Sequence, residues 1–262
     1  MRTQVMLIAT LLFVFSSLAH AAMRTKTIDY AAGGKTMRGV LIWDDATTAK
    51  RPGLLLVPNW RGINDANIRK AETIAGRDYV IFMGDMYGKD TRPKNNAEAQ
   101  VAVKPLYADR ALMRARVNAA FDQLKMLTSQ APIDTQRLAA IGFCFGGSSV
   151  LDLARSGTDV AAVVSFHGEL STDDPSLAKN IKARVLAMNG ADDKRTMPDA
   201  GKFMDEMRMS PAEWQFVVFG HAVHCFAEPD AHSPPGCVYN PKVAARAFKL
   251  MHAWLDEAFA HD

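Results

Sequence analysis

A cysteine set between glycines is the residue of this sequence whose surroundings point most clearly to chemistry. The segment Gly142–Gly147 reads Gly-Phe-Cys-Phe-Gly-Gly, and it joins an apolar run, Leu138–Phe143, to a helical pattern that extends to Ser156. Glycines two positions before and after a nucleophile permit a tight strand-to-helix turn, because a Cβ atom there would collide with neighbouring backbone. Such a turn places Cys144 at a helix N-terminus, where the helix dipole favours a thiolate. A buried structural cysteine in a glycine-containing turn is the alternative.

Acidic and histidine side chains follow two later apolar runs along the chain. The run Ala183–Met188 leads into Asn-Gly-Ala-Asp-Asp, which ends at Asp193. The run Trp214–Phe219 is followed by His221 and His224. A nucleophile, an acid and a histidine that each come directly after a strand can meet at one edge of a parallel sheet. We therefore expect a site of nucleophilic catalysis at this edge.

The elements that must position these side chains alternate between apolar runs and helical patterns. Several of the runs are continuous in Val, Ile, Leu and Ala, which is typical of strands buried on both faces. This alternation predicts an α/β fold, a mostly parallel central sheet with helices on both faces. The first two strands have no helix between them and are expected to form an antiparallel hairpin at an edge. The expected strands are Thr27–Tyr30, Met37–Trp43, Gly53–Val57, Tyr79–Met83, Leu138–Phe143, Val160–Ser165, Ala183–Met188 and Trp214–Phe219, and the expected helices are Asp65–Ala75, Ala108–Leu127, Phe145–Ser156, Pro198–Met209 and Val243–Ala258.

Taken together, these motifs resemble the dienelactone hydrolase family of the α/β-hydrolase superfamily. The resemblance extends over nearly all of the chain after its N-terminal segment. It includes Val57–Asn64 (Val-Pro-Asn-Trp-Arg-Gly-Ile-Asn), Asp85–Gly88 (Asp-Met-Tyr-Gly), the cysteine turn, Gly-Ala-Asp-Asp and Ala-Val-His-Cys-Phe. It implies one α/β-hydrolase domain over residues 22–262 that hydrolyses small carboxylic esters or lactones without a cofactor or metal.

The resemblance also assigns the triad residue by residue. Cys144 takes the position of the nucleophile. The acid of the family follows a glycine by three residues, which selects Asp193 over Asp192. Its histidine precedes a small residue and then Phe, which selects His224 over His221. The histidine would then take or hold the thiol proton, and the carboxylate would fix the histidine tautomer.

Further site residues are expected around the triad. The backbone N–H groups of Phe145, at the start of the helix, and of Trp60, by resemblance, would form an oxyanion hole. Asn59 stands where the family usually has a Glu, and because an amide cannot ionise, His224 would activate the thiol alone. Asn59, Tyr87 and His167 are candidates for the substrate pocket, although structural packing is the alternative for the tyrosine and the histidine.

The N-terminal segment has the pattern of a cleaved signal peptide. Arg2 precedes Val5–Leu18, which carries no charge, and small residues follow in Ala-His-Ala up to Ala21. The apolar stretch is shorter than the roughly 20 residues of a membrane-spanning helix. We expect residues 1–21 to be removed and the protein to be periplasmic or secreted, with no membrane attachment after cleavage. A start at Met23 would instead give a cytoplasmic product.

The composition is that of a globular protein. Of its 262 residues 48% are hydrophobic and 23% charged, which argues against disordered or collagen-like chains. The formal net charge is +3, far from the basic excess that binding to a phosphate backbone requires. A small-molecule partner is therefore expected rather than a nucleic acid.

The chain has three cysteines, and two of them flank one loop rich in Pro and Gly. In an exported protein, Cys225 and Cys237 can close this loop as a disulfide, which leaves Cys144 as the free thiol. Two unpaired thiols are the alternative. A zinc site would need the group His221, His224, Cys225, His232 and Cys237, whose spacing fits none of the familiar zinc motifs.

The main hypothesis is an exported, cofactor-free hydrolase with a Cys-His-Asp triad. One alternative is a catalytically weak α/β-hydrolase scaffold that binds a ligand or partner, a possibility that Asn59 raises. An acyltransferase with the same nucleophile, or a redox or zinc-binding protein that uses the Cys/His cluster, are further alternatives.

Overall fold

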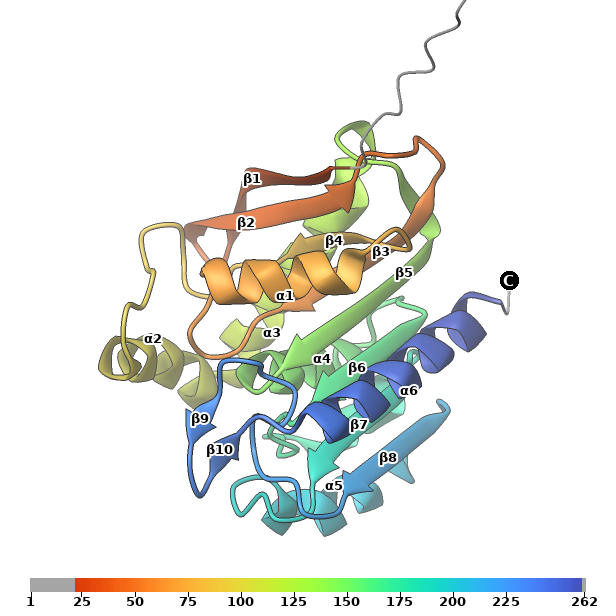
Figure 1. Cartoon of the computed structure of the whole chain (residues 1–262). Helices are drawn as coiled ribbons and strands as arrows, with labels where there is room; N and C mark the ends of the chain where they lie inside the picture. The colour runs from red at the N-terminus through yellow and green to blue at the C-terminus, as the bar shows by residue number, and fades with distance from the viewer. Residues whose placement is uncertain (1–21, 261–262) are drawn as a thin grey trace, which may run out of the picture.

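An eight-stranded sheet lies at the centre of the protein, with helices on both of its faces (Figure 1). The computed structural model describes residues 22–260. The strand order is β1-β2-β4-β3-β5-β6-β7-β8; β1 pairs antiparallel with β2, β2 pairs antiparallel with β4, and the pairs from β4 to β8 are parallel. The strands are β1 Met23–Ala32, β2 Lys35–Asp44, β3 Arg51–Val57, β4 Val80–Met83, β5 Ile133–Phe143, β6 Ala162–Phe166, β7 Arg184–Gly190 and β8 Trp214–Phe219.

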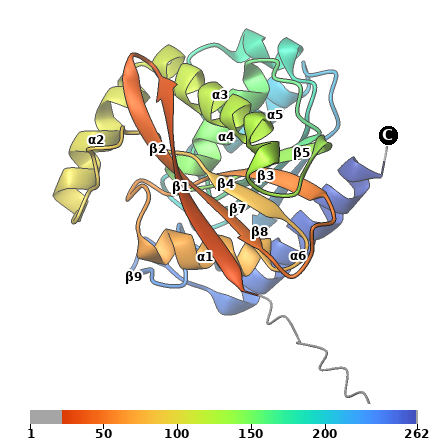
Figure 2. The same cartoon turned by 90° about the horizontal axis from the view of Figure 1, so that it is seen from above.

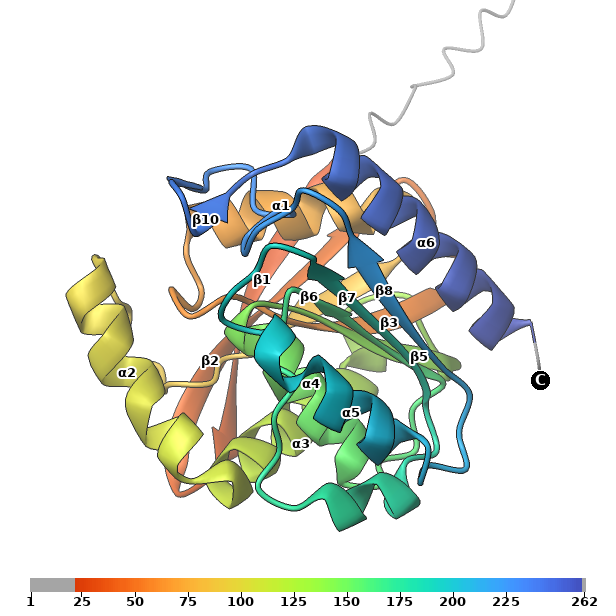
Figure 3. The same cartoon turned by 90° about the horizontal axis from the view of Figure 1, so that it is seen from below.

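Two layers of helices cover the sheet (Figure 2). Helices α1 and α6 pack on one face, and α3, α4 and α5 pack on the other, where α2 extends outward beside α3 (Figure 3). Successive residues of β3 alternate between the two cores: Leu54 faces α1 and α6, while Leu55 belongs to the other cluster. The helices are α1 Asp65–Ala75, α2 Asn96–Ala108, α3 Arg110–Met126, α4 Phe145–Arg155, α5 Ala200–Met207 and α6 Pro241–Phe259.

Most of the expected elements are found close to their expected bounds. The antiparallel hairpin β1–β2 at one edge is confirmed, and α1 and β8 have the expected residues. Helix α2 was not expected, because Pro105 lies within it and its own apolar residues form only a weak helical pattern. The two short strands β9 His232–Ser233 and β10 Cys237–Val238 were also not expected, since two paired residues leave no readable pattern.

Two helix starts illustrate how local sequence fixes the elements. The side chain of Asn64 accepts a hydrogen bond from the N–H of Asn67 and so caps α1. Asn240 caps α6 in the same way, and Pro241 follows it as the first helical residue. Within residues 22–260, no helix is long and apolar enough to cross a membrane. The expected signal peptide, residues 1–21, lies outside the described residues.

The parallel strands β3, β5, β6, β7 and β8 all end at the same edge of the sheet. The loops that follow these strands carry Trp60, Cys144, His167, Asp193 and His224 in turn. The topology therefore brings together residues that lie far apart in the sequence.

Candidate active site

Cys144 occupies the sharp turn between β5 and α4. Its backbone has φ 54° and ψ −117°, a conformation that L-residues rarely adopt, and its N–H donates to the carbonyl of Phe166. A Cβ atom at Gly142 would lie 2.1 Å from the carbonyl oxygen of Gly146, and one at Gly146 would lie 2.0 Å from that of Val57. Both glycines are therefore required by close backbone contacts, as the sequence pattern predicts. The turn leaves the Cys144 side chain partly exposed.

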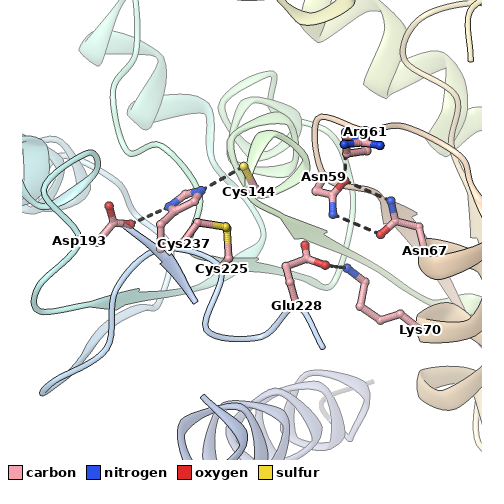
Figure 4. The surroundings of a disulfide bond; sticks show 10 residues. Asn59, Arg61, Asn67, Lys70, Cys144, Asp193, Cys225, Glu228 and Cys237 are labelled. Carbon is pink, nitrogen blue, oxygen red and sulfur yellow. Dashed lines mark hydrogen bonds and ion pairs between the residues drawn. A yellow bond between two sulfur atoms is a disulfide. The ribbon is translucent and has the colours of Figure 1, made fainter. Parts of the chain in front are cut away.

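The side chains of Cys144, His224 and Asp193 form a continuous chain of contacts (Figure 4). His224 Nε2 lies 3.1 Å from Cys144 Sγ, and His224 Nδ1 lies 2.7 Å from Asp193 Oδ2. The acid and histidine loops are packed closely, because a Cβ atom at Gly190 would lie 2.3 Å from the carbonyl oxygen of Ala222. The arrangement is that of a nucleophile, a base and an orienting acid.

The neighbouring candidates, Asp192 and His221, are exposed and take no part in these contacts. Asp193, by contrast, is buried, and its carboxylate accepts hydrogen bonds from the N–H of Arg195 and from the Thr196 hydroxyl, at 3.0 and 2.8 Å. These donors orient the carboxylate toward the imidazole. The structure thus brings together the pair selected by the family motif.

The electrostatics of the triad favour a charged pair. Burial alone would lower the pKa of His224, but the adjacent Cys144 sulfur and the hydrogen bond to Asp193 outweigh it and raise the pKa to about 10. Burial likewise acts to raise the pKa of Asp193, yet the histidine and the Thr196 hydroxyl hold it below its ordinary value. At neutral pH the His224 imidazole is therefore held in its protonated form, between the Cys144 sulfur and the Asp193 carboxylate.

The loop after β3 is held by side-chain amides. The Asn59 side-chain oxygen accepts from the N–H of Arg61 at 3.0 Å and from the Asn67 amide at 3.2 Å. The hydroxyl of Tyr87 donates to the carbonyl oxygen of Trp60 at 2.8 Å. Asn59 therefore fixes the shape of the loop that carries Trp60. Across the site, Phe145 is the first residue of α4, so its N–H has no partner within the helix.

Aromatic rings surround the side chain of Phe145. Tyr87 is buried and stacks on it with ring centroids 5.8 Å apart, and Tyr107 of α2 contacts it edge-on at 5.6 Å. Tyr107 was missed in the sequence because its helix was not expected. The pKa values of both tyrosines are raised, chiefly by burial, so both hydroxyls remain protonated.

His167 lies behind the triad histidine rather than at an open surface. It is 0% exposed, its ring centroid is 5.2 Å from that of His224, and neither ring nitrogen has a hydrogen-bond partner among the described residues. Burial, with a smaller contribution from the His224 charge, lowers its pKa well below the ordinary value. His167 is therefore a neutral ring that packs against His224, and the expectation that it lines the pocket does not agree with its burial.

A hollow of about 540 Å³ opens beside His224 and Asp193. Its walls come from the acid loop, the histidine loop and the loop that precedes β10. The lining residues are Asp192, Asp193, Lys194, Arg195, Val223, His224, Ser233, Pro235, Gly236 and Cys237. The hollow is large enough for a small organic molecule.

The remaining two cysteines, Cys225 and Cys237, are joined as a disulfide, and Cys144 is free. Within residues 22–260, no group of three or more His, Cys, Asp or Glu side chains is arranged to hold a metal ion. A buried ion pair, which the sequence did not reveal, links α1 to the disulfide loop: Lys70 Nζ lies 2.5 Å from Glu228 Oε2. A lysine among the apolar positions of α1 was its only sequence signal.

Comparisons with known proteins show which family this chain resembles in sequence and fold. The model of the dienelactone hydrolase family matches residues 37–259. The structure of P91, a dienelactone hydrolase-like promiscuous phosphotriesterase from metagenomic libraries, is 35% identical in sequence, covers 90% of this chain and 99% of its own, and superposes with a TM-score of 0.83.

Curated sequences give two further relatives. A Bradyrhizobium protein named as a probable 2-oxo-3-(5-oxofuran-2-ylidene)propanoate lactonase is 28% identical over 71% of this chain and 79% of its own length. An uncharacterized protein of Caenorhabditis elegans is 32% identical over 56% of this chain and 95% of its own length. The α/β-hydrolase fold expected from the sequence is confirmed. The chain belongs to the dienelactone hydrolase family, a family of hydrolases.

Proposed function

We propose that this protein hydrolyses small carboxylic esters or lactones through an acyl-cysteine intermediate, with Cys144, His224 and Asp193 as its triad. The observation that supports this most is the contact chain from Cys144 Sγ through the His224 ring to Asp193, at 3.1 and 2.7 Å. The proposal needs no cofactor, because the nucleophile, the proton carrier and the oxyanion donors all come from the protein.

The reaction would proceed in two steps. In the first, the Cys144 thiolate attacks the carbonyl carbon, and the backbone N–H groups of Trp60 and Phe145 stabilise the oxyanion. The His224 imidazolium then gives its proton to the departing alkoxide, which leaves an acyl group on the sulfur. In the second step, His224 takes a proton from water, the hydroxide attacks the thioester, and the thiolate leaves.

The relatives guide the choice of substrates. The Bradyrhizobium relative is named for a lactone substrate, which supports lactones as the first candidate substrate class. P91 is named for phosphotriester hydrolysis, and its 35% identity over most of this chain makes phosphotriesters a second candidate substrate class. A thiolate beside an oxyanion hole can attack either centre.

Export is part of the proposal. The pattern of residues 1–21 is that of a signal peptide, and the Cys225–Cys237 disulfide is of a kind that persists in oxidising compartments. Fractionation of cells that express the full chain tests this, with the N-terminal residue of the recovered protein as readout. A chain that begins at residue 22 in the periplasm or medium is expected, whereas uncleaved cytoplasmic protein would contradict export.

Stopped-flow hydrolysis of p-nitrophenyl acetate by residues 22–262 tests the chemistry, with Cys144→Ala as the matched control. We expect a burst of nitrophenolate followed by turnover, and we expect both to be absent in the variant. A burst without turnover would indicate acyl transfer to another acceptor. Equal rates for the two proteins would contradict the triad and favour a ligand-binding scaffold.

A further inference from the structure

The segment that follows His224 is closed on itself by a disulfide (Figure 4). Cys225 comes directly after His224, and it is buried with φ +65°, in the left-handed region that favours glycine. Its partner, Cys237, lies at the other end of the loop, twelve residues later. One end of the disulfide is therefore adjacent in the sequence to His224, the general base of the proposed triad.

The second cysteine also lies against the same histidine. Cys237 begins β10, which pairs with β9, and its backbone forms an isolated bridge with His224. The N–H of the next residue, Val238, donates to the carbonyl oxygen of His224 at 3.1 Å. The backbone of His224 is thus held on one side by its bond to Cys225 and on the other by the strand that Cys237 begins.

A buried ion pair anchors the start of the disulfide loop to helix α1. Glu228 contacts Lys70 at 2.5 Å, and both side chains are about 5% exposed. The Lys70 ammonium lies 3.9 Å from the centre of the Phe143 ring, and Phe143 directly precedes Cys144 in the sequence. This side of the loop is anchored to the body of the protein, whereas residues 232–236 are exposed. The disulfide is the covalent anchor of that exposed end.

The disulfide can be reached from the site itself. Cys237 is partly exposed and lines the hollow beside His224, together with Pro235 and Gly236. A small reductant that enters this hollow therefore contacts Cys237. We therefore expect a small reductant to approach the disulfide without unfolding of the core.

We propose that Cys225 and Cys237 are positioning residues for His224, and that reduction of their disulfide by a dithiol lowers the hydrolytic activity. This inference rests on the proposed function. In the reaction, the thiolate of the dithiol attacks one sulfur and breaks the S–S bond, and its second thiol closes to release a cyclic disulfide. The protein gains two electrons and two protons as two cysteine thiols. The dithiol is oxidised, and Cys144 is not consumed.

We expect reduction to displace His224 without removing any catalytic group. With the bond broken, the strand that begins at Cys237 is no longer tied to Cys225, and His224 loses its fixed position against Cys144 Sγ. Misplacement of a catalytic group by about 1 Å lowers rates by up to roughly 100-fold. The ion pair and the contact of His224 with Asp193 persist, so we expect kcat to fall about 10- to 100-fold rather than to vanish.

The test compares the oxidised protein, the same protein reduced with a phosphine and desalted, and the variant Cys225→Ser/Cys237→Ser. A phosphine is used because a residual thiol would attack the acyl-enzyme. In the double variant Cys144 is the only cysteine, so its alkylation by iodoacetamide reports its contact with His224 directly. The readouts are kcat on p-nitrophenyl acetate, the alkylation rate of Cys144 at about pH 6.5, followed on its own peptide because the reduced wild-type protein has two further thiols, and the unfolding temperature.

We expect kcat and the alkylation rate to fall together in the reduced protein and in the double variant, at temperatures where both remain folded. Reoxidation should restore both in the wild-type protein, and the phosphine should leave the double variant unchanged. A lower unfolding temperature with unchanged kcat and alkylation would overturn the proposal, since the disulfide would then be merely structural. Reduction of the folded wild-type protein keeps the test valid if the double variant does not fold.

His224→Ala separates this inference from the proposed function. If that variant loses activity and rapid alkylation while reduction changes neither, only the positioning role fails. If His224→Ala itself changes neither, the triad is wrong.

Discussion

The exchange Asp193→Asn replaces one carboxylate oxygen by an amide NH2 group. The surrounding hydrogen-bond donors determine which of the two oxygens is replaced. One carboxylate oxygen of Asp193 accepts from the N–H of Arg195. The other accepts from the Thr196 hydroxyl and contacts His224 Nδ1 at 2.7 Å. In the asparagine, the oxygen is expected to remain on the Arg195 N–H, because the opposite orientation would place two donors against each other. The amide NH2 would then face the imidazole.

This orientation reverses the hydrogen bond at His224 Nδ1. An NH2 group donates, so the ring must accept at Nδ1 and carry its proton on Nε2, where it can no longer take a proton from Cys144. Loss of a hydrogen bond to a charged group alone costs about 1.5–3 kcal/mol, or about 10- to 150-fold in rate. The wrong tautomer adds to this, and in serine proteases the same exchange lowers kcat about 10⁴-fold. We expect kcat to fall about 10²- to 10⁴-fold.

The assay is steady-state hydrolysis of p-nitrophenyl acetate, with Asp192→Asn as the matched control. Asp192 is the adjacent carboxylate and is exposed, so its exchange removes the same charge from the same loop without touching the imidazole. Its kcat is expected to stay within about threefold of the wild-type value, and because Asp192 lines the hollow beside His224, a change is expected in KM only. Equal losses in the two variants, or full activity in Asp193→Asn, would refute the assignment of the acid.

Three further predictions concern reactivity and stability. Because the pKa of His224 is raised to about 10, its imidazolium stays beside the Cys144 sulfur at pH 6, and His224→Ala should slow the alkylation of Cys144 by iodoacetamide at that pH at least about tenfold. Arg155→Met should lower the free energy of unfolding in urea by about 3–5 kcal/mol, since it leaves the buried Glu206 carboxylate without its ion-pair partner and removes one arginine from Asp152, which keeps Arg110. The exposed Arg208→Met should change it by less than about 0.5 kcal/mol. Gly146→Ala should abolish ester hydrolysis, because its Cβ would lie 2.0 Å from a β3 carbonyl oxygen; wild-type rates would contradict this.

The central sheet was predictable because its strands are buried on both faces. The run Leu54–Val57 is fully buried, and a continuous apolar run is the sequence signature of such a strand. The turn at Cys144 was predictable because only glycine fits at Gly142 and Gly146, whose Cβ atoms would overlap backbone. In both cases the residue types of one short segment indicate its structure without information from distant segments.

Other features depend on contacts between distant segments and could not be predicted. Nothing near Glu228 in the sequence indicates that it pairs with Lys70, 158 positions away. Tyr107 contacts Phe145 only because α2 carries it to the start of α4, and Pro105 obscured the pattern of α2 in the sequence. The pattern placed His167 at the correct edge of the sheet, but its burial depends on the distant rings of His224 and Phe226, which pack against it.

The account depends most directly on a covalent bond between the substrate acyl group and Cys144. Rapid acid quench of the protein with p-nitrophenyl acetate, followed by mass spectrometry of the peptides, tests this bond. The account predicts one acetyl group on the peptide that contains Cys144, formed at least as fast as turnover, and none in Cys144→Ala. Turnover without acetylation at Cys144, or acetylation of another residue in step with turnover, would contradict it.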